Sequence, residues 1–242
     1  MNQEVKNRLV FPLDVSTEDE AIFWIDKLKD YVGVFKIGLE LFTACGPRII
    51  DRIKEKTQAK IFLDLKLNDI PNTILRTIRV ISNLGVDWVT VHILSGEKAF
   101  KTAVDTAYNN LKIIGVTILT SLDRAELLAL GFNGELVREI KDLVFHLAKI
   151  IWLAGGDGIV CSPKEVYQIK QAFPELITVV PGIRLKESED DQIRVATPYE
   201  ATKAGADYLV VGRPIRDAFS PIEVCKKVLE EIEKALKEKE NA

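Results

Sequence analysis

The hydrophobic residues of this chain fall into short apolar runs that alternate with longer stretches of helical periodicity. Eight of the short runs combine β-branched and aromatic residues in the way typical of buried strands. The predicted strands span Leu9–Val15, Val34–Gly38, Ile61–Lys66, Trp88–Ile93, Ile113–Leu119, Gly158–Cys161, Ile177–Val180 and Tyr208–Val211. Several are apolar at almost every position, which is typical of parallel strands that are covered on both faces.

Amphipathic stretches with helical spacing follow the strands. Clear examples are Glu18–Tyr31, Pro47–Lys56, Asn72–Leu84, Gly96–Asn109, Gly134–Leu153 and Ile222–Lys239. Eight such strand-then-helix units predict an α/β fold of the (β/α)8 TIM-barrel type, with a doubly wound open sheet as the lesser alternative. No linker or low-complexity segment divides the 242 residues. We therefore expect a single barrel domain over residues 1–242.

Charge and cysteine usage narrow the classes of partner and location. The net charge is −3, so the field of the whole protein favours neither nucleic acid nor an anionic membrane, and an anionic substrate needs a local site. Three separated cysteines without a C-x-x-C pair argue against a disulfide framework and favour a reducing, cytoplasmic location. No segment approaches the ~18 uninterrupted apolar residues of a membrane span. Two histidines cannot build a His-rich metal site.

The most informative segment of the chain is Lys60–Thr73, with the sequence KIFLDLKLNDIPNT. Residues two apart on a strand point to the same face, so Asp64 and Lys66 project together at a strand end. Asp69 follows just beyond, and Pro71 opens a helix where its missing N–H costs little. An ordinary ion pair is the simpler interpretation of D-x-K alone, but the second acid and the following Ile-Pro-Asn-Thr favour a functional site.

Two further charged residues lie in or just after the first two strands, near the same predicted barrel mouth. Asp14 interrupts the end of the first strand, and Ser16 and Thr17 are better placed than Asp14 to cap the next helix. Asp14 is therefore available for function. Lys36 is a charge inside an apolar strand, and a buried ammonium group is costly without an anion. We expect it to pair with Asp64 or with a ligand.

The segments after strands seven and eight carry candidate phosphate ligands. They are Pro181-Gly182-Ile183-Arg184 and Gly212-Arg213. Loops at these places in barrels often bind phosphate, where glycine lets the backbone approach and arginine offers a matching fork of donors. Each motif alone could be a simple turn. The polar segment from Leu185 to Ala196 predicts a functional loop, in which Gln192 could donate a hydrogen bond to a phosphate.

Taken in order, these residues resemble the orotidine 5′-phosphate decarboxylase family over nearly the whole chain. The specific match is the D-x-K-x-x-D-I-P-N-T block from Asp64 to Thr73. Weaker matches are Leu13-Asp14-Val15, Lys36-Ile37-Gly38, Leu119-Thr120-Ser121, Pro181-Gly182-Ile183-Arg184, Asp191-Gln192, Ala196-Thr197-Pro198 and Val211-Gly212-Arg213. Members commonly carry Phe-His where this chain has Leu67-Asn68. That departure falls between the charged positions and concerns local packing.

The resemblance implies a cofactor-free, metal-free conversion of orotidine 5′-phosphate to UMP, the last step of pyrimidine nucleotide synthesis. Lys66 would protonate pyrimidine C6, within a charge network formed with Lys36, Asp64 and Asp69 of the partner subunit. The implied assembly is a homodimer with two shared sites. The implied substrate-binding residues are Asp14, Lys36, Asp64, Ile70, Thr73, Thr120, Ser121, Pro181, Arg184, Gln192, Gly212 and Arg213.

Three alternatives compete with this assignment. Magnesium-dependent sugar-phosphate decarboxylases and hexulose-phosphate lyases share D-x-K-x-x-D but place a glutamate on strand two, where this chain has Lys36. An ammonium group cannot ligate magnesium, which argues against them. A class I aldolase would use Lys66 or Lys36 as a Schiff base, which borohydride would trap. A non-catalytic binder would hold a nucleotide without turnover.

Overall fold

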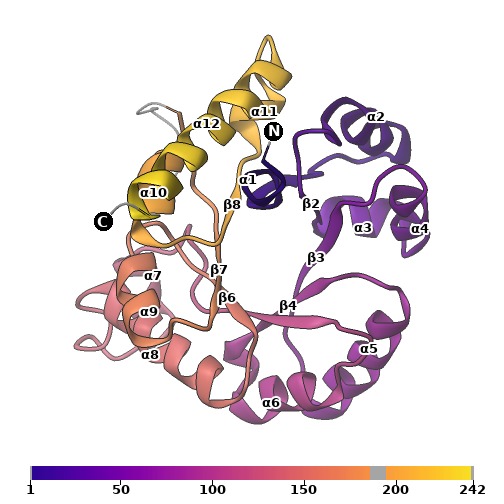
Figure 1. Cartoon of the computed structure of the whole chain (residues 1–242). Coiled ribbons are helices and arrows are strands. Elements are labelled where there is room, and N and C mark those ends of the chain that lie inside the picture. Colours follow the sequence, from indigo (N-terminus) through magenta and orange to yellow (C-terminus); the bar gives the residue numbers. More distant parts are fainter. Residues whose placement is uncertain (1, 186–194, 241–242) are drawn as a thin grey trace.

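Eight parallel strands close into a barrel in the computed structural model, which describes residues 2–185 and 195–240. The strands pair in chain order, and the last pairs back onto the first. They are β1 (Leu9–Pro12), β2 (Val34–Ile37), β3 (Lys60–Leu67), β4 (Trp88–His92), β5 (Lys112–Val116), β6 (Gly158–Val160), β7 (Ile177–Val180) and β8 (Tyr208–Val210). Figure 1 shows the helices arranged around the strands. The predicted (β/α)8 barrel is confirmed, and the open sheet is wrong.

The helices differ from the sequence prediction mainly at their ends. They are α1 (Gln3–Asn7), α2 (Glu18–Leu28), α3 (Leu39–Cys45), α4 (Arg48–Lys54), α5 (Pro71–Asn83), the 3-10 turn η1 (Ile93–Ser95), α6 (Glu97–Thr106), α7 (Arg124–Ala129), α8 (Ile140–Leu153), α9 (Val166–Ala172), α10 (Pro198–Ala204), α11 (Arg213–Arg216) and α12 (Pro221–Glu240). The helix predicted to begin at Gly134 begins only at Ile140. Here the Asn133 side chain accepts the N–H of Glu135, and such local bonds compete with helix formation.

Six of the strands end before the predicted residue, β1 and β5 by three residues each. β1 ends at Pro12, so Asp14 lies in a loop and not at the end of the strand. β5 ends at Val116, and Thr120 follows the strand as predicted, but four residues beyond its end. Thr17 caps α2 through its side chain, which accepts the N–H of Glu20. The cap is the one predicted, and it leaves the Asp14 side chain available at the barrel mouth.

The barrel interior is layered, with an apolar layer below a polar one. The apolar layer consists of Val10, Val34, Phe62, Trp88, Ile114 and Val179. Lys36, Asp64 and Thr90 lie two residues beyond Val34, Phe62 and Trp88 on the same strands, so they point to the same face. A separate apolar core lies between the barrel and the helices. The apolar layer thus closes the barrel below, and the polar side chains are held at its C-terminal mouth.

A repeated Gly-x-Asp turn fastens the opposite end of the barrel. The three pairs are Gly85 and Asp87, Gly155 and Asp157, and Gly205 and Asp207, before β4, β6 and β8. Each glycine has a positive φ, which glycine adopts without strain. Each carboxylate accepts, at 2.8 Å, the backbone N–H of a residue in the preceding strand: Ile61, Ile113 or Thr178. These bonds join β3 to β4, β5 to β6 and β7 to β8.

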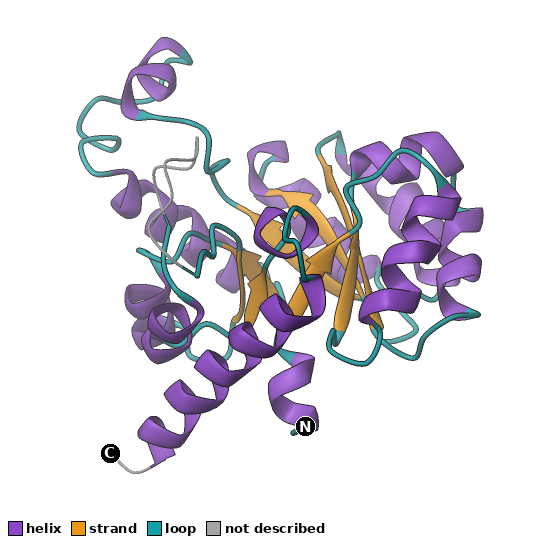
Figure 2. Ribbon diagram, turned by 90° about the horizontal axis from the view of Figure 1, so that it is seen from above, coloured by secondary structure: helices purple, strands orange, loops and turns teal. Residues whose placement is uncertain are grey.

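The turn before β2 departs from this pattern. It carries Gly33 where the others carry aspartate, and a Cβ at Gly33 would lie 2.4 Å from the Cα of Asn7. The end of α1 therefore occupies the space that an aspartate side chain would need. Figure 2 shows that α1 and the end of α12 lie at the same end of the barrel.

No helix within residues 2–185 and 195–240 is long and apolar enough to cross a membrane.

Replacement of Asp207 by alanine should destabilise the fold. Its carboxylate accepts bonds from Lys170 Nζ, Thr178 N and Thr178 Oγ1, and Thr178 is fully buried. Lys170 keeps the carbonyls of Pro174 and Leu176 as acceptors, but leaving the two Thr178 donors without their acceptor should lower the free energy of unfolding by about 2–3 kcal/mol. Urea unfolding followed by circular dichroism measures the change. The matched control is Asp105→Ala, which removes only an exposed helical pair with Lys101; equal midpoints for the two variants would contradict the prediction.

Candidate active site

Four side chains of alternating charge form a continuous row at the C-terminal mouth of the barrel. Lys36 Nζ on β2 lies 3.1 Å from Asp14 Oδ1 and 3.5 Å from Asp64 Oδ2. Lys66 Nζ lies 2.9 Å from the same Asp64 Oδ2. The predicted pairings of Lys36 with Asp64, and of Asp64 with Lys66, are therefore present. Asp64 is the centre of the row, because both ammonium groups meet at one of its oxygens.

The neighbouring charges keep Asp64 ionised despite its burial. Burial is the largest single influence and acts to raise the pKa of this carboxyl. It is outweighed together by the charges of Lys36 and Lys66 and by hydrogen bonds from Lys66 and Thr90, so the pKa lies below its ordinary value. The ionised carboxylate in turn holds two ammonium groups close together at the barrel mouth, where they would otherwise repel each other.

The backbone that carries Lys66 is not a regular strand. Lys66 has a φ of 49°, a left-handed conformation that costs an ordinary residue roughly 1–2 kcal/mol. The pairing register of β3 with β4 shifts here: Leu63 lies opposite Val89, but Leu67 lies opposite Val91. Two extra residues of β3 are thus accommodated between these pairs. Strained backbone of this kind gathers at functional sites, where the surrounding structure holds it in place.

Thr90 on β4 is a component of the site that sequence reasoning missed. Its Oγ1 donates to Asp64 Oδ1 at 3.0 Å and accepts the backbone N–H of Lys66 at 2.7 Å. The available signal was a hydroxyl residue among the apolar residues of β4. Thr90 lies two positions before His92, so both side chains point to the same face of the strand. His92 is nearly buried, and burial and the charge of Lys66 lower its pKa.

A small cavity of about 170 Å³ opens directly beside the charged row. Its lining combines Lys36, Asp64 and Lys66 with Thr120, Pro181 and the apolar residues Phe62, Val116, Ile118, Leu119, Val160, Val179 and Val210. Loop residues after β5 and β7 therefore meet the charges of β2 and β3, as the barrel rule predicts. Ser121, the neighbour of Thr120, is exposed and does not line this cavity.

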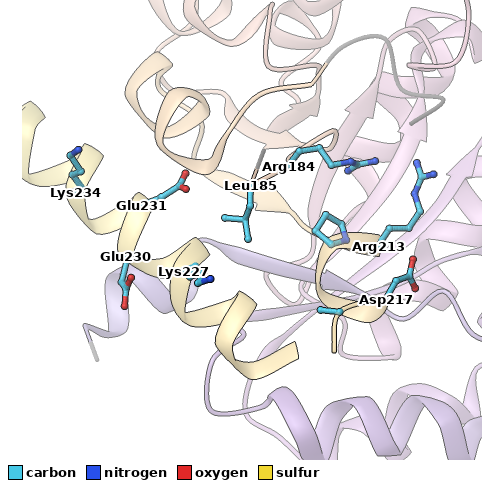
Figure 3. Close-up of a pocket in the computed structure, with 10 residues that line it drawn as sticks. Arg184, Leu185, Arg213, Asp217, Lys227, Glu230, Glu231 and Lys234 are labelled. Carbon is cyan, nitrogen blue, oxygen red and sulfur yellow. The ribbon is translucent and has the colours of Figure 1, made fainter. Parts of the chain in front are cut away.

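Arg184 and Arg213 line a second, larger groove of about 770 Å³ beside the barrel mouth. Figure 3 shows both side chains, with their guanidinium groups extending to the same side. The other lining residues are Leu185, Pro214, Asp217, Ala218, Lys227, Glu230, Glu231 and Lys234. The loops after β7 and β8 thus present two arginines to one groove. Arg184 is buried, and its Nη1 donates to Ile183 O at 2.9 Å. Guanidinium groups that extend to the same side suit a phosphate group.

The loop that begins at Leu185 has its two ends joined. Arg184 N donates to Ala196 O at 2.9 Å, and Ala196 N donates to Gly182 O at 3.2 Å. Gln192, which the sequence places in this loop, lies outside the described residues. Gly212 packs tightly on β1, because a Cβ there would lie 2.8 Å from the Cγ of Pro12. A side chain at position 212 would therefore disturb the end of β1, two residues before Asp14.

The remaining candidates lie at the surface, between β3 and the start of α5. Asp69, Ile70 and Thr73 are all exposed, and the large apolar side chain of Ile70 is 66% exposed. The carboxylate of Asp69 accepts the N–H of Ile70 at 2.7 Å, and Pro71 is the first residue of α5 as predicted. Among the described residues, no group of three His, Cys, Asp or Glu side chains is placed to hold a metal ion.

Comparisons with known proteins agree with this architecture. Residues 7–228 match the model of the orotidine 5′-phosphate decarboxylase / HUMPS family. The chain is similar to the orotidine 5′-phosphate decarboxylase of Desulfosudis oleivorans, with 44% identity over 96% of this chain and 95% of that one. It is also 43% identical to that of Carboxydothermus hydrogenoformans, over 96% and 98%. The crystal structure of the Lactobacillus acidophilus enzyme covers 93% of this chain and 98% of its own, with 31% identity and a TM-score of 0.78.

Proposed function

This chain belongs to the orotidine 5′-phosphate decarboxylase / HUMPS family, and we propose that it converts orotidine 5′-phosphate to UMP and carbon dioxide without a cofactor. The observation that carries the proposal is the row Asp14–Lys36–Asp64–Lys66 beside a small cavity. The reaction is a step of pyrimidine nucleotide synthesis, and the protein is accordingly a carboxy-lyase.

Lys66 is the proposed proton donor. When the bond between C6 and the carboxylate breaks, carbon dioxide leaves and the electron pair stays on C6. The Lys66 ammonium transfers a proton to C6, which gives UMP, and the neutral amine regains a proton from water. A fixed ammonium beside C6 also stabilises the negative charge as it develops, which is worth most where water is excluded. The apolar lining of the cavity supports this part of the proposal.

The phosphate, ribose and base have separate proposed partners. Arg184, Arg213, the backbone of Gly212, and Gln192 would hold the phosphate. Asp14 and Lys36 would bind the ribose hydroxyls. Thr120 is the better candidate for the base than Ser121, because it lines the cavity beside Lys66; Pro181 shares that lining. Phosphate binding away from the reacting bond can supply energy for orienting the pyrimidine.

We also propose a cytoplasmic homodimer in which each site is shared. Asp69, Ile70 and Thr73 would reach the site of the partner subunit, where the carboxylate of Asp69 extends the charge network. The exposure of all three residues, and of the apolar side chain of Ile70 in particular, supports this arrangement. The three free cysteines suit a reducing compartment.

The family name also covers HUMPS proteins, and Lys36 favours the decarboxylase. At this position on strand two the magnesium-dependent relatives place a glutamate, whereas the ammonium group of Lys36 offers no oxygen to a metal. In this chain the same ammonium group lies 3.5 Å from Asp64. The ammonium group of Lys36 therefore already pairs with the carboxylate that a magnesium ion would need as a ligand.

The first test is the ultraviolet absorbance of orotidine 5′-phosphate mixed with the protein in excess EDTA. We expect rapid conversion to UMP, because every proposed group belongs to the protein itself. No conversion by correctly folded protein, followed by activity on a hexulose phosphate once magnesium is restored, would contradict the proposal and favour the metal-dependent relatives.

A further inference from the structure

Thr90 has an unusual position among the residues of the barrel interior. It is fully buried on β4, directly above the apolar layer that contains Trp88. A buried hydroxyl group without hydrogen-bond partners is costly, but this one both donates and accepts a hydrogen bond. Its proton goes to Asp64 Oδ1 at 3.0 Å, and its oxygen accepts the backbone N–H of Lys66 at 2.7 Å. One hydroxyl therefore binds the side chain of Asp64 and the backbone of Lys66, which are both residues of the candidate active site.

The bond to the Lys66 backbone falls where the sheet itself is irregular. Between the pairs Leu63–Val89 and Leu67–Val91 the register of β3 shifts against β4, and Lys66 takes its left-handed conformation there. A backbone N–H at such a place needs another acceptor, and the Thr90 oxygen is that acceptor. The hydroxyl thus helps to hold the strained backbone from which the Lys66 side chain extends.

The bond to Asp64 fixes how the carboxylate is turned. Oδ1 faces Thr90, which leaves Oδ2 toward Lys66 at 2.9 Å and Lys36 at 3.5 Å. If the carboxylate rotated, the two ammonium groups would lose their common acceptor. Both bonds of Thr90 therefore act on the position of the Lys66 ammonium group, one through the backbone and one through Asp64.

We propose that Thr90 is a positioning residue for the decarboxylation, which sets the place of the Lys66 ammonium group through its bonds to Asp64 and to the Lys66 backbone. This inference rests on the proposed function. Thr90 itself need not touch the substrate, since it does not line the cavity beside Lys66. A positioning role predicts a loss in kcat with little change in KM, because the phosphate and ribose contacts remain.

The test compares Thr90→Val with a matched variant at the other end of the barrel. Thr178 is equally buried on β7, donates to Asp207 Oδ2 at 3.0 Å and accepts the N–H of Asp207 at 3.0 Å. Thr90→Val should lower kcat on the order of 10- to 100-fold. Thr178→Val removes the same kind of bonds far from the site, and it should lower the unfolding midpoint while leaving kcat within about twofold.

The pH profile separates positioning from a general loss of structure. The charged groups around Asp64 are Lys36 from β2 and Lys66 from β3, with Asp14 beyond Lys36. The titratable side chain of His92 on β4 lies near Lys66, which helps to lower its pKa. The Thr90 bond helps to lower the pKa of Asp64. Removing it should raise that pKa and move the acidic limb of kcat/KM to higher pH. Thr90→Ser should restore both kcat and the wild-type limb.

Thr90→Cys provides a second comparison if valine prevents folding, since a thiol is of similar size to a hydroxyl but a weaker donor. The inference is supported if the cysteine variant has a lower kcat and an acidic limb displaced to higher pH, and if the serine variant recovers both wild-type properties. Equal kcat and pH profiles in wild type, Thr90→Cys and Thr178→Val would overturn it. If the wild-type protein itself fails to convert orotidine 5′-phosphate, the proposed function fails first, which is a different result.

Discussion

Replacing Lys66 by alanine should lower kcat/KM for orotidine 5′-phosphate by ~10,000-fold or more, because the variant loses both the proton donor for C6 and the charge beside it. The Asp64 carboxylate also loses its partner at 2.9 Å, so the remaining row becomes more negative where the substrate carboxylate must bind. The absorbance assay in EDTA measures the loss. Calorimetric binding of UMP shows in parallel that the phosphate and ribose contacts survive.

The control for this variant lies on the same strand. Lys60 begins β3 at the opposite end of the barrel, where its ammonium group lies 5.6 Å from the centre of the Trp88 ring. Lys60→Ala removes a lysine from the same element without touching the charged row, and it should keep kcat/KM within about twofold. Residual activity of Lys66→Ala within tenfold of wild type would exclude Lys66 as the proton donor.

Mixing two inactive variants should restore activity if Asp69 completes the site of the partner subunit. Lys66→Ala and Asp69→Ala each inactivate both sites of their own homodimer. After subunit exchange, half of the dimers are mixed, and each mixed dimer contains one site with both residues intact. The expected recovery is about a quarter of the wild-type activity. The measurement is the absorbance assay over time after mixing equal amounts of the two proteins.

Subunit exchange must be shown independently, for example by mass spectrometry of dimers that carry different tags. The matched control mixes Lys66→Ala with Asp64→Ala. These two residues lie on one strand within one charged row, so no mixed dimer regains a complete site and the mixture should stay inactive. Proven exchange without recovery in the Asp69 mixture would exclude the shared site.

The sequence predicted those features of the site that follow from strand order and alternation. Lys36 and Asp64 meet because β2 and β3 are neighbours in a barrel. Arg184 and Arg213 line one groove because β7 and β8 are neighbours too. Both contacts follow from the barrel fold and from the rule that the C-terminal ends of its strands lie together at one face.

The sequence could not predict the details that depend on local backbone irregularity. Alternation alone places Asp64 and Lys66 on one face, and their ion pair is present. It gives no warning of the left-handed conformation of Lys66 or of the register shift. The role of Thr90 depends on that shift, and a threonine is also an ordinary strand residue. Its importance therefore became visible only with the geometry. Gln192 lies outside the described residues, so its role stays a prediction.

The Gly-x-Asp turns have a consequence for the order in which the barrel folds. Their bonds join residues 26, 44 and 29 positions apart, so β3–β4, β5–β6 and β7–β8 can each form as a local unit with a short loop to close. Pairing of Leu9 with Leu209 instead joins the two ends of the chain, and no aspartate strengthens the unit that contains β1. We therefore expect the ring to close last, with the seam between β1 and β8 as the slowest contact to form.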